Sequence, residues 1–322
     1  MKRYFVAVAA LVAAFGLATS VQAQEKKNRI SIGTGGTGGV YYPLGGGLAA
    51  IISKYVPGVE ATAEVTAGSI ANLQLISGGK SEVGFTMADS AWDAYNGLDK
   101  FSGKKVPLRT LAVFYPNRMQ VVTIEGTGIN KFSDLKGKRV STGAPASGTE
   151  VMSMRLIEAL GMDPNKDMTR ERLSVAESVN ALKDRKIDAL FWVGGVPTPS
   201  LTDLAATPGV TIKLIDHGDG AEKMRAKYGP IYVKNRILAN AYPGDKVDTT
   251  NVDVWNLLVV PENADEKLVY EITKVLFEKK DELVKVHKDA SFLELSNQTT
   301  NASPLPYHPG SIRYFKERGL KF

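Results

Sequence analysis

Residues 29–48 read RISIGTGGTGGVYYPLGGGL, a short β-rich run followed by a glycine loop and an apolar segment. This order predicts a strand, a tight loop and a helix. The order recurs, with strands expected at 29–32, 59–65, 83–87 and 109–114 and helices at 43–55, 69–77 and 90–96. Strands that alternate with helices are typical of parallel sheets with crossover helices, so the sequence predicts an α/β half.

A second α/β half follows in the chain. Its expected strands are 120–124, 139–141, 172–175, 187–193 and 211–215, and its expected helices are 148–160, 176–184 and 199–206. A strand at 254–260 and helices at 265–280 and 311–318 then return the chain to the first half. We therefore expect two lobes: lobe I at 24–117 plus 253–322, and lobe II at 118–252. Two hinge crossings are expected near 115–118 and 250–256, with a ligand cleft at the carboxyl ends of the strands.

The first residues have the layout of a secretory signal. Lys2 and Arg3 precede an apolar run that ends at Ala18, and small residues lead to Ala23. The apolar run is shorter than the roughly 20 residues that span a bilayer. We expect cleavage after Ala23, which makes residues 1–23 a signal peptide and places the mature protein in the periplasm. The chain has no cysteine, which excludes disulfides, thiolate metal sites and a lipid anchor on cysteine.

Two glycine loops resemble nucleotide-binding motifs. Residues 33–38 satisfy GxGxxG, but the bulky Tyr41 and Tyr42 follow where a Rossmann helix would already pack on its sheet. Residues 143–150 have the glycine spacing of a phosphate loop, but Glu150 stands near the place of its lysine and would repel a triphosphate. Nucleotide binding is therefore not expected. Ser147 and Glu150 instead predict a capping box at a helix start.

The same loops place helix N-termini after predicted strands. Unpaired N–H groups of a first helical turn bind anions without a formal positive charge. Five loops share this layout: 33–39, 68–72, 89–90, 143–149 and 194–199. An ordinary βα connection explains each loop alone, whereas five in two lobes favour a site for an anionic solute.

Composition and motifs argue against other functions. Lysine and arginine number 40 against 34 acids, a net charge of +6, and they form no basic stripe with aromatics, so no nucleic-acid partner is expected. The histidines, His217, His287 and His308, are far apart, and no metal spacing or Gly-x-Ser-x-Gly elbow is present, so no metal, cofactor or catalytic residue is expected. An exported α/β enzyme and a periplasmic ligand sensor stay as alternatives to a transport protein.

Several motifs carry a family resemblance over nearly all of the mature chain. They are IGTGGTGGVYYPLGGGLA, VTAGSIANLQLISGG, FTMADSAWDAYNG, LAVFYP, FSDLKGKRVSTGAPASGTE and PLPYHPGSIRYFKERG. The chain resembles the TAXI type of substrate-binding protein from tripartite ATP-independent periplasmic (TRAP) transporters. The resemblance implies a type II periplasmic-binding-protein fold that captures an organic anion or amino acid, of the glutamate or dicarboxylate type, and delivers it to a membrane permease. We expect a monomer.

By position, the resemblance implies ligand contacts in both lobes. Lobe I would contribute Thr34, Gly35, Gly39, Tyr41, Ser69, Asn72, Asp89, Ser90 and Tyr115, and lobe II would contribute Thr142, Ser147, Gly148 and Thr149. The segment FWVGGVPTPSLTDLA departs from the family pattern by placing Trp192 and Pro197 near the cleft, with Trp192 either a lid or a core residue. The expected cleft loops contain no arginine or lysine. Arg118 and Arg155 are the nearest candidates, and we expect both to be structural or on the surface.

Overall fold

The computed structural model describes residues 28–299 and 303–322. The signal peptide expected at residues 1–23 lies outside the described residues. No helix in the described part of the chain is both long and apolar enough to cross a membrane.

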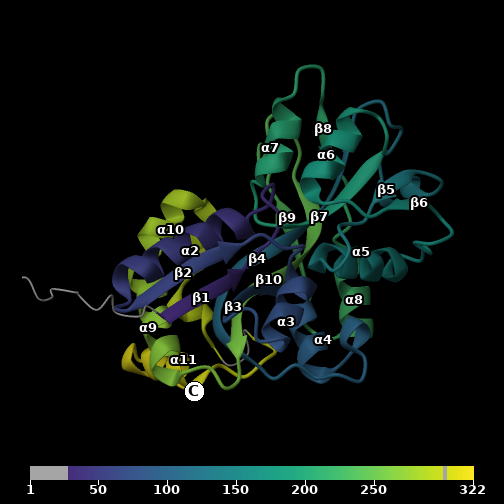
Figure 1. Cartoon of the computed structure of the whole chain (residues 1–322). Helices are drawn as coiled ribbons and strands as arrows, with labels where there is room; N and C mark the ends of the chain where they lie inside the picture. The colour runs from purple at the N-terminus through teal and green to yellow at the C-terminus, as the bar shows by residue number, and fades with distance from the viewer. Residues whose placement is uncertain (1–27, 300–302) are drawn as a thin grey trace, which may run out of the picture.

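The described strands form a single ten-stranded sheet in the order β2-β1-β3-β10-β4-β7-β5-β6, with β8 added to β4 and β9 added to β10 (Figure 1). Within each flank the pairs β1–β2, β1–β3, β5–β6 and β5–β7 are parallel, as the alternating pattern predicts. The strands are β1 (Asn28–Gly33), β2 (Val59–Glu64), β3 (Val83–Met87), β4 (Leu108–Ile124), β5 (Arg139–Ser141), β6 (Thr169–Glu171), β7 (Ala189–Gly194), β8 (Ile212–Leu214), β9 (Val233–Ile237) and β10 (Thr249–Pro261).

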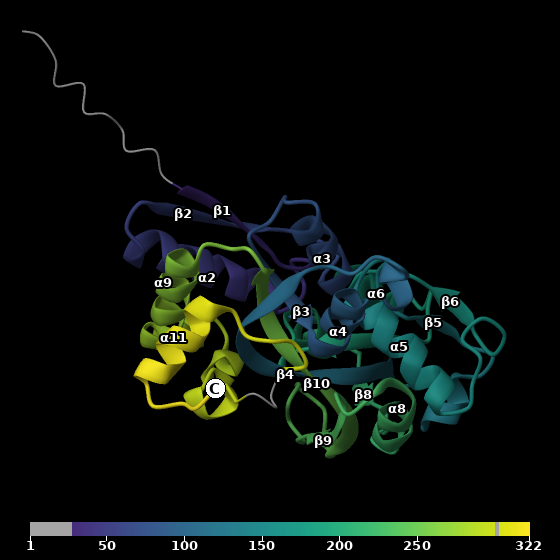
Figure 2. The same ribbon diagram turned by 90° about the horizontal axis from the view of Figure 1, so that it is seen from below.

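Helices divide between two lobes (Figures 1 and 2). Lobe I holds α2 (Tyr41–Tyr55), α3 (Ser69–Ser77), α4 (Ala88–Asn96), α9 (Glu266–Glu278), α10 (Lys280–Val286), α11 (Pro309–Glu317) and the 3-10 turns η1 (Asp99–Phe101), η3 (Lys288–Phe292) and η4 (Leu295–Asn297). Lobe II holds α5 (Gly148–Ala159), α6 (Val175–Lys183), α7 (Pro199–Ala206), α8 (Gly220–Tyr228) and the 3-10 turn η2 (Phe132–Leu135). The C-terminal helices α9 and α10 pack against α2 of the N-terminal part of the chain.

Two long antiparallel strands, β4 and β10, run through both lobes (Figure 2). The sequence predicts separate strands at 109–114 and 120–124, whereas β4 is continuous over 17 residues. It is continuous because β10 pairs with it from Leu108 to Arg118, across the expected gap, and β7 continues the pairing from Arg118 to Thr123. The register shifts near Trp255 and Val259, and such irregularities bend and twist paired strands.

Buried apolar side chains join the lobes as well as filling them. One cluster, which includes Leu44 and Phe85, lies under α2 and α9 in lobe I, and another, which includes Val179 and Leu190, lies in lobe II. The largest cluster contains residues of both lobes, among them Met87 of β3 and Val151 of α5. The two lobes are therefore in close apolar contact in this structure.

Some elements differ from the sequence prediction. The strand predicted at 172–175 is wrong, because β6 lies at Thr169–Glu171 and α6 already begins at Val175. The elements α8 and β9 were not predicted. The strand β9 is exposed at four of its five positions, so it lacks the apolar alternation that identifies a strand in sequence.

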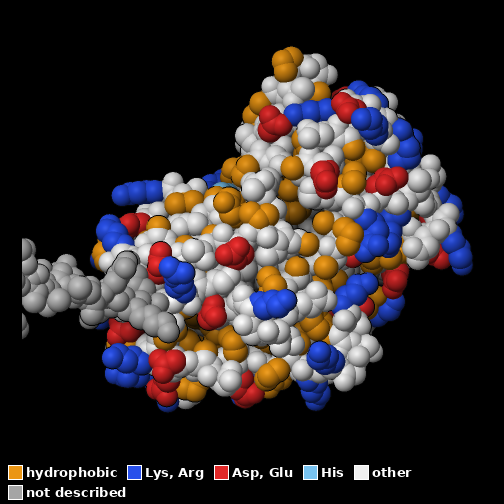
Figure 3. All heavy atoms as spheres, in the orientation of Figure 1, with side chains coloured by type: hydrophobic (Ala, Val, Ile, Leu, Met, Phe, Trp, Pro, Cys, Tyr) orange, Lys and Arg blue, Asp and Glu red, His pale blue; other side chains and the backbone are white. Residues whose placement is uncertain are grey.

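On the face seen in Figure 3, lysine and arginine are interspersed with aspartate and glutamate.

Candidate ligand-binding site

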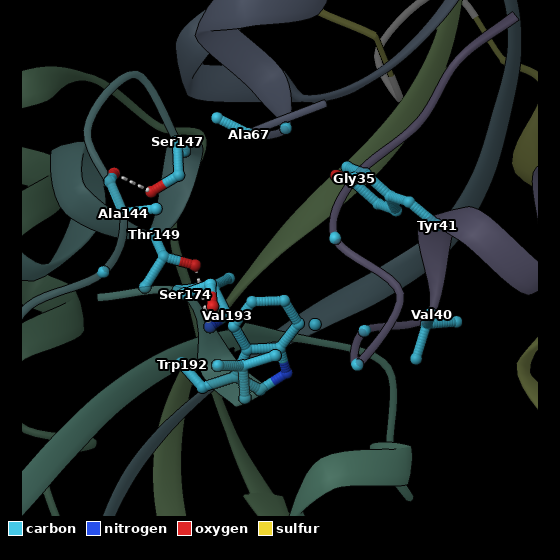
Figure 4. Close-up of a pocket in the computed structure, with 18 of the residues that line it drawn as sticks. Gly35, Val40, Tyr41, Ala67, Ala144, Ser147, Thr149, Ser174, Trp192 and Val193 are labelled. Atoms are coloured by element: carbon cyan, nitrogen blue, oxygen red, sulfur yellow. Dashed lines mark hydrogen bonds between the residues drawn. The ribbon is translucent and has the colours of Figure 1, made fainter. Parts of the chain in front are cut away.

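A cavity of about 210 Å³ lies between the lobes, and both lobes line it (Figure 4). Lobe I contributes residues 35–41 of the glycine loop, residues 65–69, Met87 and Tyr115. Lobe II contributes residues 143–144 and 147–149, 173–176 and 192–194. The cavity exceeds the roughly 150 Å³ that holds a benzene molecule and is smaller than the roughly 300 Å³ at which drug-sized pockets begin. It therefore fits a small metabolite.

Four helices of the described chain begin at this cavity. They are α2 at Tyr41, α3 at Ser69, α5 at Gly148 and α6 at Val175. The first N–H groups of a helix lack partners within it and carry a partial positive charge. Because these N-termini come from both lobes, a negatively charged group in the cavity lies among several aligned donors.

Three hydroxyl groups at these helix starts each accept a backbone N–H and keep their own proton to donate. The Ser69 Oγ accepts the Met87 N–H at 3.1 Å, and the Thr149 Oγ1 accepts the Val193 N–H at 3.3 Å. The Ser174 Oγ accepts the Glu177 N–H at 3.3 Å. A hydroxyl that already accepts one proton still has its own proton to donate. These side chains therefore suit an acceptor group on a ligand.

Ser147 caps α5, as predicted, but the capping box is only half formed. Its Oγ accepts the Glu150 N–H at 3.1 Å and donates to the Ala144 carbonyl at 2.7 Å, so both of its roles are occupied within the loop. The Glu150 carboxylate does not reach back, because it accepts from the Arg172 Nε at 2.6 Å. The complete capping box is at Ser174 and Glu177, at the start of α6.

Two tyrosines, Tyr41 and Tyr115, pack edge-on with ring centroids 6.5 Å apart. The Tyr41 hydroxyl accepts a hydrogen bond from the Asn117 Nδ2 at 3.2 Å. Tyr115 is fully buried, and its hydroxyl has no hydrogen-bond partner within the described residues. Burial raises the pKa of both phenols, so both stay protonated and neutral near neutral pH.

Trp192 lines the cavity from β7, with its ring across the side of the cavity opposite Ser147 and Ala67 in Figure 4. Its indole N–H donates to the Thr198 Oγ1 at 2.9 Å, which fixes the ring. A Cβ at Gly39 would stand 2.9 Å from the ring atom Cη2, so only glycine fits there without movement. The ring is therefore a wall of the cavity that also packs on the glycine loop of lobe I.

Nine of the residues predicted from the sequence line this cavity. They are Gly35, Gly39, Tyr41, Ser69, Tyr115, Ser147, Gly148, Thr149 and Trp192. Six do not line it: Thr34, Asn72, Asp89, Ser90, Thr142 and Pro197.

The side chains of those that lie outside bind the protein framework instead. The Thr34 hydroxyl donates to the Glu64 carbonyl at 2.6 Å, and the Asn72 Nδ2 donates to the Thr34 and Phe85 carbonyls at 2.6 and 2.8 Å. The Thr142 hydroxyl donates to the Glu171 carbonyl at 3.3 Å. The peptide bond between Val196 and Pro197 is cis, and the Pro197 carbonyl accepts a hydrogen bond from the His287 Nε2 at 2.9 Å.

Asp89 and Ser90 begin α4, which faces a different cluster. The Asp89 Oδ2 accepts from the Tyr232 hydroxyl at 2.9 Å, and Arg155 lies 2.5 Å from the Asp93 carboxylate and 3.8 Å from that of Asp89. Burial raises the pKa of both carboxyls, that of Asp93 to about 6. Arg155 is thus structural, as expected, but it is largely buried and links α5 of lobe II to α4 of lobe I. Arg118 pairs with Asp289 at 3.7 Å.

Other lining residues were not predicted. Thr66, Ala67 and Met87 flank predicted positions, and residues 173–176 span the start of α6, of which the sequence assigned 173–175 to a strand. Ser174 with Glu177 three residues later was a readable helix-start signal. Among the residues described, none that line the cavity is acidic, basic or a histidine.

Several solved structures are similar to this chain. A protein from Bordetella bronchiseptica RB50 matches with a TM-score of 0.51 and 18% identity, over 90% of this chain and 89% of that chain. An ancestral arginine-binding protein bound to arginine matches with a TM-score of 0.50 and 16% identity, over 82% of this chain and 98% of that chain. The aliphatic sulphonate binding protein SsuA from Escherichia coli matches with a TM-score of 0.48 and 13% identity, over 90% of this chain and 83% of that chain.

At these identities the likeness concerns the fold alone, and it confirms the two-lobed α/β fold predicted from the sequence. The profile of the NMT1-like family matches residues 32–319, which include every residue that lines the cavity. The chain belongs to the NMT1-like family.

Proposed function

We propose that this protein is a periplasmic solute-binding protein that closes on a small organic anion and delivers it to the membrane permease of a TRAP transporter. The observation that carries the proposal is the cavity between the lobes, where helix N-termini of both lobes meet and no charged side chain of the described residues is present. The arginine-binding protein of similar fold supports a binding role. The TAXI-like motifs support a TRAP permease, and residues 1–23 support export.

Binding would follow from the donors around the cavity. A single helix N-terminus stabilises an anion by about 0.3–1 kcal/mol at an exposed site and up to about 2 kcal/mol where partly buried. The N-termini of α3, α5 and α6 also carry the hydroxyls of Ser69, Thr149 and Ser174, which have protons to donate. Because these donors belong to different lobes, they reach one anion together only when the lobes are closed.

Contacts between the lobes support closure as the working motion. The Ala71 N–H of α3 donates to the Ala146 carbonyl before α5 at 3.1 Å, and the Ser200 N–H of α7 donates to the Gly38 carbonyl at 3.2 Å. Both bonds lie beside the cavity and join loops of different lobes. In the described residues the chain crosses between the lobes only within the strands β4 and β10. A hinge in these strands, at the expected crossings 115–118 and 250–256, would open the cavity to solvent.

The proposal involves no chemical step. Hydroxyls, amides and aromatic rings surround the cavity, and none of its described side chains titrates near neutral pH to serve as a general base. The protein would bind and release its ligand unchanged.

Native mass spectrometry of the mature protein, purified without denaturation, tests the proposal directly, and we expect a bound organic acid. In a thermal-shift screen of organic acids and amino acids, a ligand at 100 times its dissociation constant should stabilise the protein by about 2.7 kcal/mol. A protein that carries no ligand and responds to no member of the screen contradicts the proposal.

Ala67 offers a matched pair of variants, because it is exposed at the cavity wall. Ala67→Glu adds a negative charge beside the ligand, whereas Ala67→Gln adds nearly the same volume without charge. We expect the glutamate variant to bind the captured acid at least about tenfold more weakly than the glutamine variant, which is 1.4 kcal/mol. Equal affinities would show that the ligand is not an anion.

A further inference from the structure

We infer that the ligand carries one anionic group on an apolar body, as a monocarboxylate does, and that the cavity rejects zwitterionic amino acids and dianions. This inference rests on the proposed function and narrows its ligand class. It departs from the glutamate and dicarboxylate type that the sequence resemblance implies.

The anionic end would meet donors that have no other partner. Besides the helix N-termini, the cavity is lined by Tyr115, whose hydroxyl is fully buried and unpartnered within the described residues. An unpaired buried donor lowers the stability of the folded state, so a native protein keeps it only where a ligand, an ion or a water accepts its hydrogen bond. A carboxylate oxygen is the matching acceptor, because the raised pKa of the phenol keeps its proton in place.

An ammonium group would find no carboxylate partner among the described residues that line the cavity. Desolvating an ammonium requires a carboxylate or a set of free carbonyl acceptors. Among the described residues that line the cavity there is no aspartate or glutamate. The buried acids nearby are engaged elsewhere, Asp89 with Tyr232 and Arg155, and Asp289 with the Val196 N–H at 2.9 Å.

A second carboxylate would add a further negative charge to the closed cavity, and no lysine or arginine of the described residues lines the cavity to neutralise it. Arg118 and Arg155 are held by acids outside it. The remaining walls are apolar. Val40 and Trp192 lie on one side in Figure 4, and Leu173 and Val175 also line the cavity. The indole N–H of Trp192 is already bonded to Thr198, so the ring offers its apolar surface.

Four six-carbon probes test the inference by isothermal calorimetry on the ligand-free mature protein: hexanoate, adipate, norleucine and hexan-1-ol. They share a chain and differ in charge. We expect hexanoate to bind at least tenfold more tightly than each of the others. Along butanoate, pentanoate and hexanoate, affinity should rise about fourfold with each methylene, the factor that corresponds to burying one CH₂.

The outcomes separate the inference from the proposed function. Tighter binding of adipate or norleucine overturns the inference and leaves solute binding intact. Equal binding of hexan-1-ol and hexanoate overturns the anionic group in both proposals. If no probe binds, the inference is wrong, and the native mass spectrum decides the proposed function separately.

Tyr115→Phe provides a second test, in which the two readouts move in opposite directions. Removing an unpartnered hydroxyl should leave the melting temperature of the ligand-free protein unchanged or higher, whereas hexanoate affinity should fall about tenfold. Tyr41→Phe is the matched control for loss of a phenol, since the Tyr41 hydroxyl already has Asn117 as a partner and its loss should lower the melting temperature. Unchanged hexanoate affinity in Tyr115→Phe overturns the role of this hydroxyl and with it the assignment of the anionic end.

Discussion

Gly148→Ala tests whether the lobes meet at the start of α5 when the ligand is bound. A Cβ at Gly148 would stand 2.5 Å from the Met87 Cε, 2.6 Å from the Ser69 Oγ and 3.0 Å from the Ser69 Cβ. The methionine end can move, but Ser69 is fixed by the hydrogen bond from the Met87 N–H. Overpacking of this kind costs about 1–3 kcal/mol, which corresponds to a loss of affinity of roughly 5- to 150-fold.

The expected loss is confined to the closed state. Alanine is a better helix former than glycine, so α5 itself should not be weakened by the substitution. In an open, ligand-free protein the added methyl group has no neighbour across the cleft, and the melting temperature should be unchanged or slightly higher. Isothermal calorimetry with the acid identified by native mass spectrometry measures the affinity, and calorimetry of the ligand-free protein measures the melting temperature.

Gly36→Ala is the matched control. Gly36 also lines the cavity, it lacks a positive φ, and a Cβ there would meet nothing within 4 Å. It should bind with an affinity close to that of the wild type. If Gly148→Ala binds the acid as tightly as Gly36→Ala does, the contact between Gly148 of α5 and Ser69 is absent from the ligand-bound protein.

Three further predictions concern the inter-lobe cluster and export. Arg155→Met leaves the Asp89 and Asp93 carboxyls without their buried cation and should lower the free energy of unfolding by about 3–5 kcal/mol in urea titrations; a loss below about 1 kcal/mol would show that the pair is not formed in solution. The pKa of Asp93 is about 6, above its usual value, so the folded protein binds this proton more tightly than the unfolded chain does. Its contribution to stability should therefore rise by roughly 2–3 kcal/mol as the pH falls from about 7.5 to about 4, and Asp93→Asn should lack this slope in urea titrations across that range. N-terminal sequencing of the protein from the periplasmic fraction should give Gln24 as the first residue, and recovery of Met1 from that fraction would contradict export by a cleaved signal.

The local pattern of the sequence determined most of the helices and strands. The bounds predicted for 69–77, 139–141 and 199–206 agree with α3, β5 and α7. These elements are marked by signals within a few residues, such as a glycine or proline at a helix start and a short apolar run for a buried strand. The Ser147 cap was readable for the same reason, because the hydroxyl and the amide that it accepts are three residues apart.

The sequence also indicated which loops lie at the ends of strands. Nine of the fifteen residues that the family resemblance implied for the site line the cavity, and their contact with a ligand stays a prediction. Which of those loops face each other was decided only by the tertiary structure. The start of α4 carries Asp89 and Ser90 in the same local pattern as the other loops, yet it faces Arg155 and Tyr232. Ser174 and Val175 at the start of α6, which the sequence assigned to the end of a strand, line the cavity in its place.

The physical reason is the distance along the chain between the groups that interact. Tyr232 lies 143 residues from Asp89, and no local pattern reports the pairing of two such groups. The pairing of β4 with β10 and β7 sets which helix ends approach one another, and this register depends on hydrogen bonds and burial across the whole sheet. The sequence alone therefore determined most of the elements and the Ser147 cap, and only the tertiary structure decided that the donors of α3, α5 and α6 surround one uncharged cavity.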